Sequence, residues 1–150
     1  MHAEVVGSKD GPLFFWNVDG AVGRNGVNND MDVLFVSWCM FKFAGLAQTP
    51  PHLREALQAA GITTFCDGSA NHRVVLGITA IQKHFNLSPV DGRVSPAKGV
   101  SYKHKYDTYG YLIMRLNAVL RVAHPDKYPR IDQMPQFAWM LKDIALAPFI

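Results

Sequence analysis

The sequence predicts a mainly α-helical single domain that spans residues 1–150. Apolar stripes recur at helical spacing along the chain, and 49% of its residues are hydrophobic, enough for one core in a chain of 150 residues. Two Asp-Gly pairs, Asp67-Gly68 and Asp91-Gly92, stand on either side of one such stripe. In these turns Asp folds its side chain onto the local backbone and Gly supplies a positive φ. The two turns therefore mark the ends of one amphipathic helix.

The first third of the chain is expected to supply an extended segment and the central helix. Residues 13–18 are apolar and aromatic and end at Asp19-Gly20, which favours a strand or an extended segment. A Gly- and Asn-rich loop over residues 23–29 follows. From Asp30 to Ala44 almost every residue is apolar, and a helix that is apolar all round lies at the centre of a fold.

Two further helices are expected before the second Asp-Gly turn. Pro50-Pro51 starts one near residues 52–60, and a brief extended piece at residues 63–65 follows it. Residues 70–85 form the third helix, because apolar residues recur there at the i, i+4, i+7, i+11 spacing of one buried stripe. That stripe consists of Val74, Ile78, Ile81 and Phe85. We expect it to dock on the central helix.

The rest of the chain is predicted to add two helices. Short extended residues flank the turn at Asp91-Gly92, and a loop runs from Ser95 to Tyr106. A fourth helix covers residues 108–122 and is stopped by His124-Pro125, and a fifth covers residues 135–145. Five helices with short extended segments make an α-dominant domain.

The charge of the chain does not point to nucleic acid or to a membrane. The formal charge is +3 and the pI is near 9.0, but no five basic residues are adjacent. The densest basic stretch runs from Lys98 to Lys105, where a solvated loop is the simpler interpretation. No run of about 18 apolar residues occurs, so we expect no membrane span.

The N-terminus and the cysteines bear on the compartment. Residues 1–10 contain no apolar run of the signal-peptide kind, so we expect cytoplasmic synthesis, with delivery to the periplasm by a specialised route as the alternative. The chain has two cysteines, Cys39 and Cys66. They allow one disulfide if they meet in space, whereas the apolar setting of Cys39 favours a small core residue.

Sequence signatures of catalysis and of metal binding are absent. The six histidines form no His-x-x-x-His pair, and His72 and His84 lie too far apart on the third helix to share one metal. No Gly-x-Ser-x-Gly elbow, dinucleotide fingerprint or Walker-type loop occurs. We expect no cofactor and no metal. Turn formation explains Asp67 and Asp91 better than paired acid-base chemistry does.

Two stretches of the chain resemble the peptidoglycan-binding-domain family, a small helical module of cell-wall-associated proteins. Residues 22–36, with Val22-Gly23 and Asp32-Val33, are similar to the family's Val-Gly entry and Asp-Val helix start. Residues 67–68, 78–81 and 90–96 resemble its Asp-Gly, Ala-Ile-x-x-Phe-Gln and Asp-Gly-Arg-Val-x-Pro motifs. The resemblance covers residues 22–98 and implies a three-helix core, which two C-terminal helices in residues 99–150 would enlarge.

The chain departs from the family where the family has two recurrent glutamines. These positions are occupied by Ser37 and Phe85, and His84 stands at the aromatic position before the second. In the family the glutamines are helix-helix or crevice groups. Their loss therefore bears on wall binding more than on the fold.

A tyrosine-rich, basic segment after the second turn is the candidate ligand site. Aromatic faces stack on sugars and cations pair with carboxylates, so the segment could line a sugar or peptide crevice. Core packing and an ordinary loop are the alternative. The predicted ligand-binding residues are Arg93, Tyr102, Lys103, Tyr106 and Tyr109, and Lys105 and Tyr111 belong to the same group.

The sequence thus predicts a non-catalytic module that binds bacterial peptidoglycan or a cell-wall fragment. The alternative is a protein-interaction domain on the same scaffold, such as an adaptor or an effector of a bacterial secretion system, which would bind a protein partner. The lost glutamines and the lack of a visible export signal motivate it. A third hypothesis is a wall hydrolase or amidase, and an open pocket joining a histidine to a carboxylate or a cysteine would favour it.

Overall fold

The structure is a computed structural model that describes residues 1–7, 11–98 and 111–134. Helices dominate this part of the chain, and two small antiparallel sheets accompany them, which confirms the helix-dominated class. The helices are α1 (Asp30–Ala44), α2 (Pro51–Ala60), α3 (Arg73–His84) and α4 (Leu112–Ala123), with a 3-10 turn at Ile131–Gln133. The strands are β1 (His2–Val6), β2 (Leu13–Asn17), β3 (Val22–Gly23) and β4 (Arg93–Val94).

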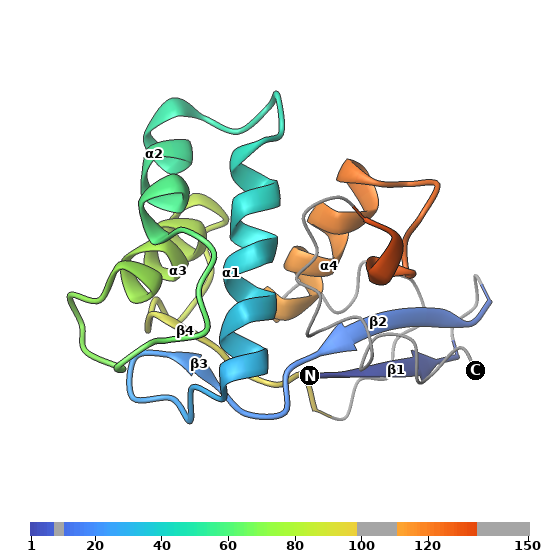
Figure 1. The fold of residues 1–150 in the computed structure, drawn as a ribbon, viewed down its shortest axis with the longest axis horizontal. Coiled ribbons are helices and arrows are strands. Elements are labelled where there is room, and N and C mark those ends of the chain that lie inside the picture. The colour runs from blue at the N-terminus through green and yellow to red at the C-terminus, as the bar shows by residue number, and fades with distance from the viewer. Residues whose placement is uncertain (8–10, 99–110, 135–150) are drawn as a thin grey trace.

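Helix α1 is the centre of the fold, as its sequence predicts. Figure 1 shows it upright between α2 and α3 on one side and α4 on the other, and it contacts both α2 and α4. Phe35, Val36, Cys39 and Met40 are all fully buried along it. A helix that is apolar on every side can satisfy all of its faces only when neighbours surround it.

Helix α3 packs mainly on α2, which corrects the expectation that it docks on the central helix. The contact between α2 and α3 is the most extensive between helices of the described residues. α3 comes close to α1 at Gly77. A Cβ added at this glycine would lie 3.2 Å from the Met40 sulfur of α1 and 3.3 Å from the Ala60 Cβ of α2. It begins at Arg73 rather than at residue 70, because the His72 ring caps it by accepting the Val74 N–H at 3.2 Å.

Helix α4 is joined to β2 through the buried amide of Asn117. This amide accepts the Trp16 N–H at 2.7 Å and donates to the Trp16 carbonyl at 2.8 Å, so it pairs with β2 as a neighbouring strand would. The Tyr128 hydroxyl donates to the same amide oxygen at 2.7 Å. α4 ends before His124-Pro125, as predicted. The fifth predicted helix, residues 135–145, lies outside the described residues.

The strands form two separate antiparallel pairs. β1 pairs with β2 in a register that sets His2 opposite Asn17, and β3 pairs with β4 through Val22 opposite Val94. The sequence predicts β2, but it does not predict β1, because five residues with no apolar run cannot be told from a loop. Val22-Gly23 is a strand and not only the start of a loop, and the extended piece expected at residues 63–65 forms no strand.

Two other expectations are settled by the described residues. Cys39 and Cys66 are both buried free thiols, so the disulfide left open by the sequence does not form. Burial raises the pKa of both thiols, because an apolar setting disfavours the charged thiolate. Within residues 1–7, 11–98 and 111–134, no helix combines the length and the apolar character needed to cross a membrane.

Candidate functional site

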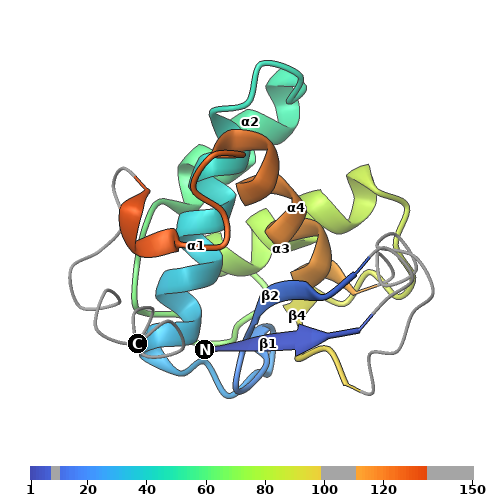
Figure 2. The same ribbon diagram turned by 90° about the vertical axis from the view of Figure 1, so that its right-hand side faces the viewer.

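Two hollows share Arg93, Ser95 and Tyr111 and together make one polar crevice, here named the Arg93 crevice. The larger hollow has a volume of about 670 Å³ and the smaller about 170 Å³. Figure 2 shows strands β1, β2 and β4, which carry much of the lining, gathered below the helices. The other polar residues of the lining are His2, Glu4, Asn17, Asp19, Gln82, Ser88, Asp91 and Lys98.

Gln82 of α3 fixes the wall of the crevice that carries Arg93. Its Nε2 donates to Asp91 Oδ1 at 2.9 Å and to the Arg93 carbonyl at 3.1 Å, and its Oε1 accepts the Gly92 N–H at 2.9 Å. Asp91 Oδ1 also accepts the Arg93 N–H at 3.0 Å, which closes the second Asp-Gly turn. Gln82 is only 4% exposed, so water competes little for these bonds.

Asn17, the last residue of β2, fixes the same wall farther along the chain. Its Nδ2 donates to the Ala97 carbonyl at 2.9 Å and its Oδ1 accepts the Ala97 N–H at 3.0 Å. The segment of residues 91–97 is thus held by a buried amide at each end. Arg93 and Ser95 are presented by backbone that is fixed before a ligand arrives, which lowers the entropic cost of binding.

Asp32 of α1 supports the opposite wall. Its buried carboxylate accepts the Gly20 N–H at 3.0 Å and the Asp19 N–H at 3.2 Å, and it lies 2.6 Å from the Met1 ammonium. These partners compensate a carboxylate that has no exposure to water. The Asp of the family-like Asp-Val helix start therefore ties α1 to the Asp19-Gly20 turn.

His2 stands in the crevice between two carboxylates. Its Nδ1 lies 2.5 Å from Asp19 Oδ1 and its Nε2 lies 3.1 Å from Glu4 Oε1. Burial lowers the pKa of His2, but the hydrogen bonds to Asp19 and Glu4 outweigh that effect and leave the pKa above its ordinary value. The hydrogen bond from the Met1 ammonium is the main cause of the lowered pKa of Asp19. The two carboxylates therefore favour the protonated form of the His2 imidazole.

Arg93 offers an unused hydrogen-bond donor. Its Nε is buried and has no hydrogen-bond partner among the described residues. Leaving such a donor unpaired costs about 1–3 kcal/mol. The Arg93 side chain lines both hollows, and a ligand carboxylate that reaches its terminal guanidinium nitrogens could accept from both, which is the two-point geometry that arginine favours.

Tyr111 provides the aromatic surface of the crevice. It precedes α4 as the N-cap residue and is exposed, and its hydroxyl donates to the Lys98 carbonyl at 3.2 Å. That hydrogen bond anchors the ring at the mouth of both hollows. An exposed, anchored ring is suited to stacking on the apolar face of a sugar.

Of the predicted ligand-binding residues, the structure describes only Arg93. It brings Arg93 together with Tyr111 on one crevice. Tyr102, Lys103, Tyr106 and Tyr109 lie outside the described residues, as does Lys105.

Both Asp-Gly turns form where the sequence places them. Gly68 has φ +78° and Gly92 has φ +70°, and each turn aspartate accepts the N–H of the residue two positions later. Asp91-Gly92 lies in the crevice wall, whereas Asp67-Gly68 does not line the crevice. The turns also bracket α3, as predicted.

The positions that replace the family's glutamines serve other contacts. Ser37 is buried, and its oxygen accepts the Thr63 N–H at 3.0 Å, which ties α1 to the loop before α3. His84 and Phe85 form a ring cluster with Phe43 at the far end of α3. None of the three lines the Arg93 crevice.

Sequence reasoning missed the two amides that shape the crevice and the histidine within it. One of them, Gln82, follows Ile78 at the i+4 position of the buried stripe, and Asn117, the amide that joins α4 to β2, follows Ile113 in the same way. A polar residue on an apolar stripe is the signal that marks such a buried amide. His2 carries no comparable signal, because β1 is not predicted, and the partner of Asn17 lies eighty positions away in the sequence.

The described residues contain no group of three or more metal-ligating side chains that could hold an ion. Comparisons of the chain with protein-family models, with curated proteins and with solved structures find no match.

Proposed function

We propose that this chain is a non-catalytic binding module whose Arg93 crevice recognises bacterial peptidoglycan or a fragment of it. The supporting observation is that the Arg93 side chain lines both hollows of the crevice and shares them with the exposed ring of Tyr111. Peptidoglycan combines sugars with short peptides that end in carboxylates. Arg93 suits the carboxylate and Tyr111 suits the sugar.

The sequence resemblance supports the same proposal. The turn Asp91-Gly92 and the residue Arg93 belong to the stretch that resembles the family's Asp-Gly-Arg-Val motif. In this chain that stretch is also the wall that Gln82 and Asn17 hold in place. We therefore propose that the three-helix core is of the peptidoglycan-binding type, with α4 as an addition.

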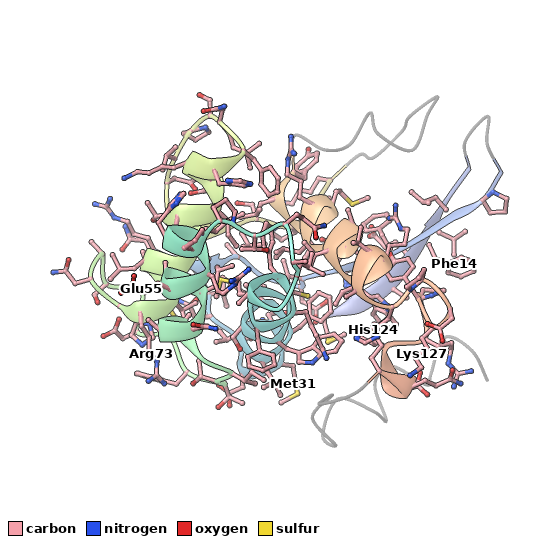
Figure 3. The ribbon with its side chains drawn as sticks, turned by 90° about the horizontal axis from the view of Figure 1, so that it is seen from above. Phe14, Met31, Glu55, Arg73, His124 and Lys127 are labelled. Atoms are coloured by element: carbon pink, nitrogen blue, oxygen red, sulfur yellow. The ribbon has the colours of Figure 1, made fainter. Side chains whose placement is uncertain are left out.

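Co-sedimentation with purified peptidoglycan sacculi at low salt tests the proposal. We expect the chain to pellet with sacculi, and Arg93→Ala to reduce the pelleted fraction severalfold because it removes the carboxylate contact. Arg93→Lys should recover little of the pelleted fraction that Arg93→Ala loses, because an ammonium cannot make the two-point contact with a carboxylate. Arg73→Ala is the matched control: Figure 3 shows Arg73 on the α3 side of the molecule, and it does not line the crevice. No pelleting of the wild-type chain, or equal losses in both alanine variants, would contradict the proposal.

A second candidate function is hydrolysis of the wall at the same crevice. The observation that favours it is His2, which an open hollow of about 670 Å³ joins to Asp19 and Glu4. A general base needs a free ring nitrogen, and here both ring nitrogens face carboxylates. This arrangement supports binding better than proton abstraction.

Release of soluble fragments from sacculi separates the two candidates. We expect the chain to release no more soluble fragments than a blank without protein. Release that is lost in His2→Ala and kept in the surface control His52→Ala would establish catalysis and overturn the non-catalytic proposal.

A further inference from the structure

A second surface lies at the C-terminal end of α1, away from the part of the Arg93 crevice that Asp32 supports. Phe43, Leu46, His84, Phe85 and Val122 line an apolar groove between the C-terminal ends of α1 and α3 and the side of α4, together with Gln48, Arg115, Ala118 and Val119. We name it the Phe85 groove. Phe43 follows Asp32 by eleven residues on α1, so at 1.5 Å per residue the groove is about 16 Å from the crevice wall that Asp32 supports.

The floor of the Phe85 groove is a preformed aromatic cluster. The rings of Phe43 and Phe85 lie 5.8 Å apart, those of Phe43 and His84 6.2 Å, and those of His84 and Phe85 4.9 Å. The Arg115 guanidinium lies 4.5 Å from the centre of the Phe85 ring. The rings meet in tilted and edge-to-face arrangements, which are favourable for aromatic pairs.

The size of the groove favours side chains over a whole small molecule. Its volume is about 220 Å³, whereas small-molecule sites typically measure about 300–1,000 Å³. The space accommodates one or two apolar side chains of a partner. Val122, which lines the groove, is 58% exposed and so offers an apolar contact at its edge.

Basic side chains border the groove. Arg115 and His84 line it, and an adjoining hollow of about 260 Å³, which shares Leu46, is lined by Lys42 and His124. Figure 3 shows His124 and Lys127 close together beyond the end of α4. No Asp or Glu among the described residues lines either hollow.

The pKa values of the rim agree with this crowding of cations. Burial, and then the charge of Lys127, lowers the pKa of Lys42. Burial, and then Lys42 and Lys127, lowers the pKa of His124, while Asp126 acts in the opposite direction.

We infer that the Phe85 groove is a docking site for an acidic segment of another protein, which inserts one or two apolar side chains among carboxylates. The apolar floor supplies the anchor and the basic rim supplies selectivity for negative charge. A second copy of the chain suits the groove less well, because each copy carries a net charge of +3. This inference does not depend on wall binding, since no described residue lines both the groove and the crevice.

The test uses two synthetic amphipathic peptides of equal length with the same Leu and Phe positions, one with Glu and the other with Lys at its polar positions. We expect the Glu peptide to shift the NMR signals of Val119, Val122 and Phe85, and the Lys peptide to leave them unchanged. Added salt should weaken binding of the Glu peptide, because part of the attraction is electrostatic.

Matched variants at exposed positions complete the test. Val122→Glu should weaken the Glu peptide about tenfold or more, because it removes an apolar contact and adds like charge. Val122→Lys should retain binding. Leu76→Glu, at a position that is 51% exposed on α3 and outside the groove, should leave binding unchanged.

The opposite results are equally definite. Equal binding of both peptides, binding of neither, or shifts confined to other residues would overturn the inference. So would a self-associated species in sedimentation that Val122→Glu dissolves, because the groove would then serve a second copy of this chain.

Discussion

The two Asp-Gly turns have the same local chemistry and different surroundings. In each, an aspartate oxygen accepts the N–H two residues later and a glycine takes a positive φ. Asp67 is exposed, and Gly68 contributes its carbonyl to the Asn25 N–H at 3.1 Å. Gly92 is wedged against α3 and is bound by the buried Gln82. The first turn reaches the rest of the fold through this backbone hydrogen bond, whereas the second is also bound by a buried side chain that makes three hydrogen bonds to residues 91–93.

This difference shows that a turn motif alone does not reveal how much the fold depends on it. The same two letters stand at both ends of α3, but only the second turn leads into a strand and a candidate binding residue. Context decides the energetic weight of each turn. The following predictions would sharpen or break this contrast.

The largest effect is expected for Gln82→Ala. It removes three hydrogen bonds from the second turn and leaves the Gly92 N–H buried without an acceptor. We expect a loss of about 3 kcal/mol in the free energy of unfolding, measured by urea denaturation. Lys83→Ala, at the exposed neighbouring position, is the control and should cost little. A loss for Gln82→Ala as small as that of the control would remove the contrast between the turns.

Alanine at the turn glycines should separate the turns next. A Cβ at residue 92 would lie 2.9 Å from Val75 Cγ1 and 3.1 Å from Thr79 Oγ1, whereas at residue 68 nothing lies closer than 3.4 Å. Both substitutions incur the cost of a positive φ, about 1 kcal/mol, and Gly92→Ala adds overpacking for a total of about 2 kcal/mol. Thermal and urea unfolding of both variants measure the difference. Equal losses would mean that α3 yields to the added methyl group.

The turn aspartates should show a smaller difference in the same direction. Asp91 Oδ1 accepts two N–H groups, from Gln82 and Arg93, whereas Asp67 Oδ1 accepts one, from Ser69. We expect Asp91→Ala to cost about 1–2 kcal/mol and Asp67→Ala to cost less. The midpoints of urea unfolding rank the two variants. A greater loss for Asp67→Ala would mean that the fold depends more on the first turn than on the second.

The smallest effect is a dependence on pH at the first turn. The hydrogen bond from the Ser69 N–H lowers the pKa of Asp67 below its ordinary value of 3.8. Its contribution to stability is therefore present above pH 3.8 and is lost as the pH falls through the lowered pKa. Asp67→Asn keeps an acceptor but does not titrate. Its stability relative to the wild type should rise on acidification through this range, and a constant difference would show that Asp67 is not linked to folding.

The helices and turns could be predicted because their signals are local. α1 follows from a continuous apolar run and has the predicted bounds, and the Pro50-Pro51 pair marks the start of α2. Both Asp-Gly turns follow from the residues that form them. The start of α3 is displaced because the His72 ring, a less usual cap, replaces the expected entry.

The candidate site could be predicted only in part, because its remaining contacts are long-range. Arg93 belongs to a recognisable motif, but Asn17 binds a residue eighty positions away and His2 depends on a strand with too few residues to give a pattern. Side-chain amides have no sequence period of their own. Their role becomes visible only once the fold has placed a backbone opposite them.

The amide of Asn117 has a consequence for association between molecules. A two-stranded ribbon leaves the outer edge of each strand open to added strands, the usual route to edge-to-edge aggregation. On β2, β1 takes one edge, and a helix side chain takes the N–H and the carbonyl of Trp16 on the other. The backbone N–H and carbonyl of Trp16 are therefore not available to pair with a strand of another molecule. One amide thus protects this edge against strand addition, as a third strand otherwise would.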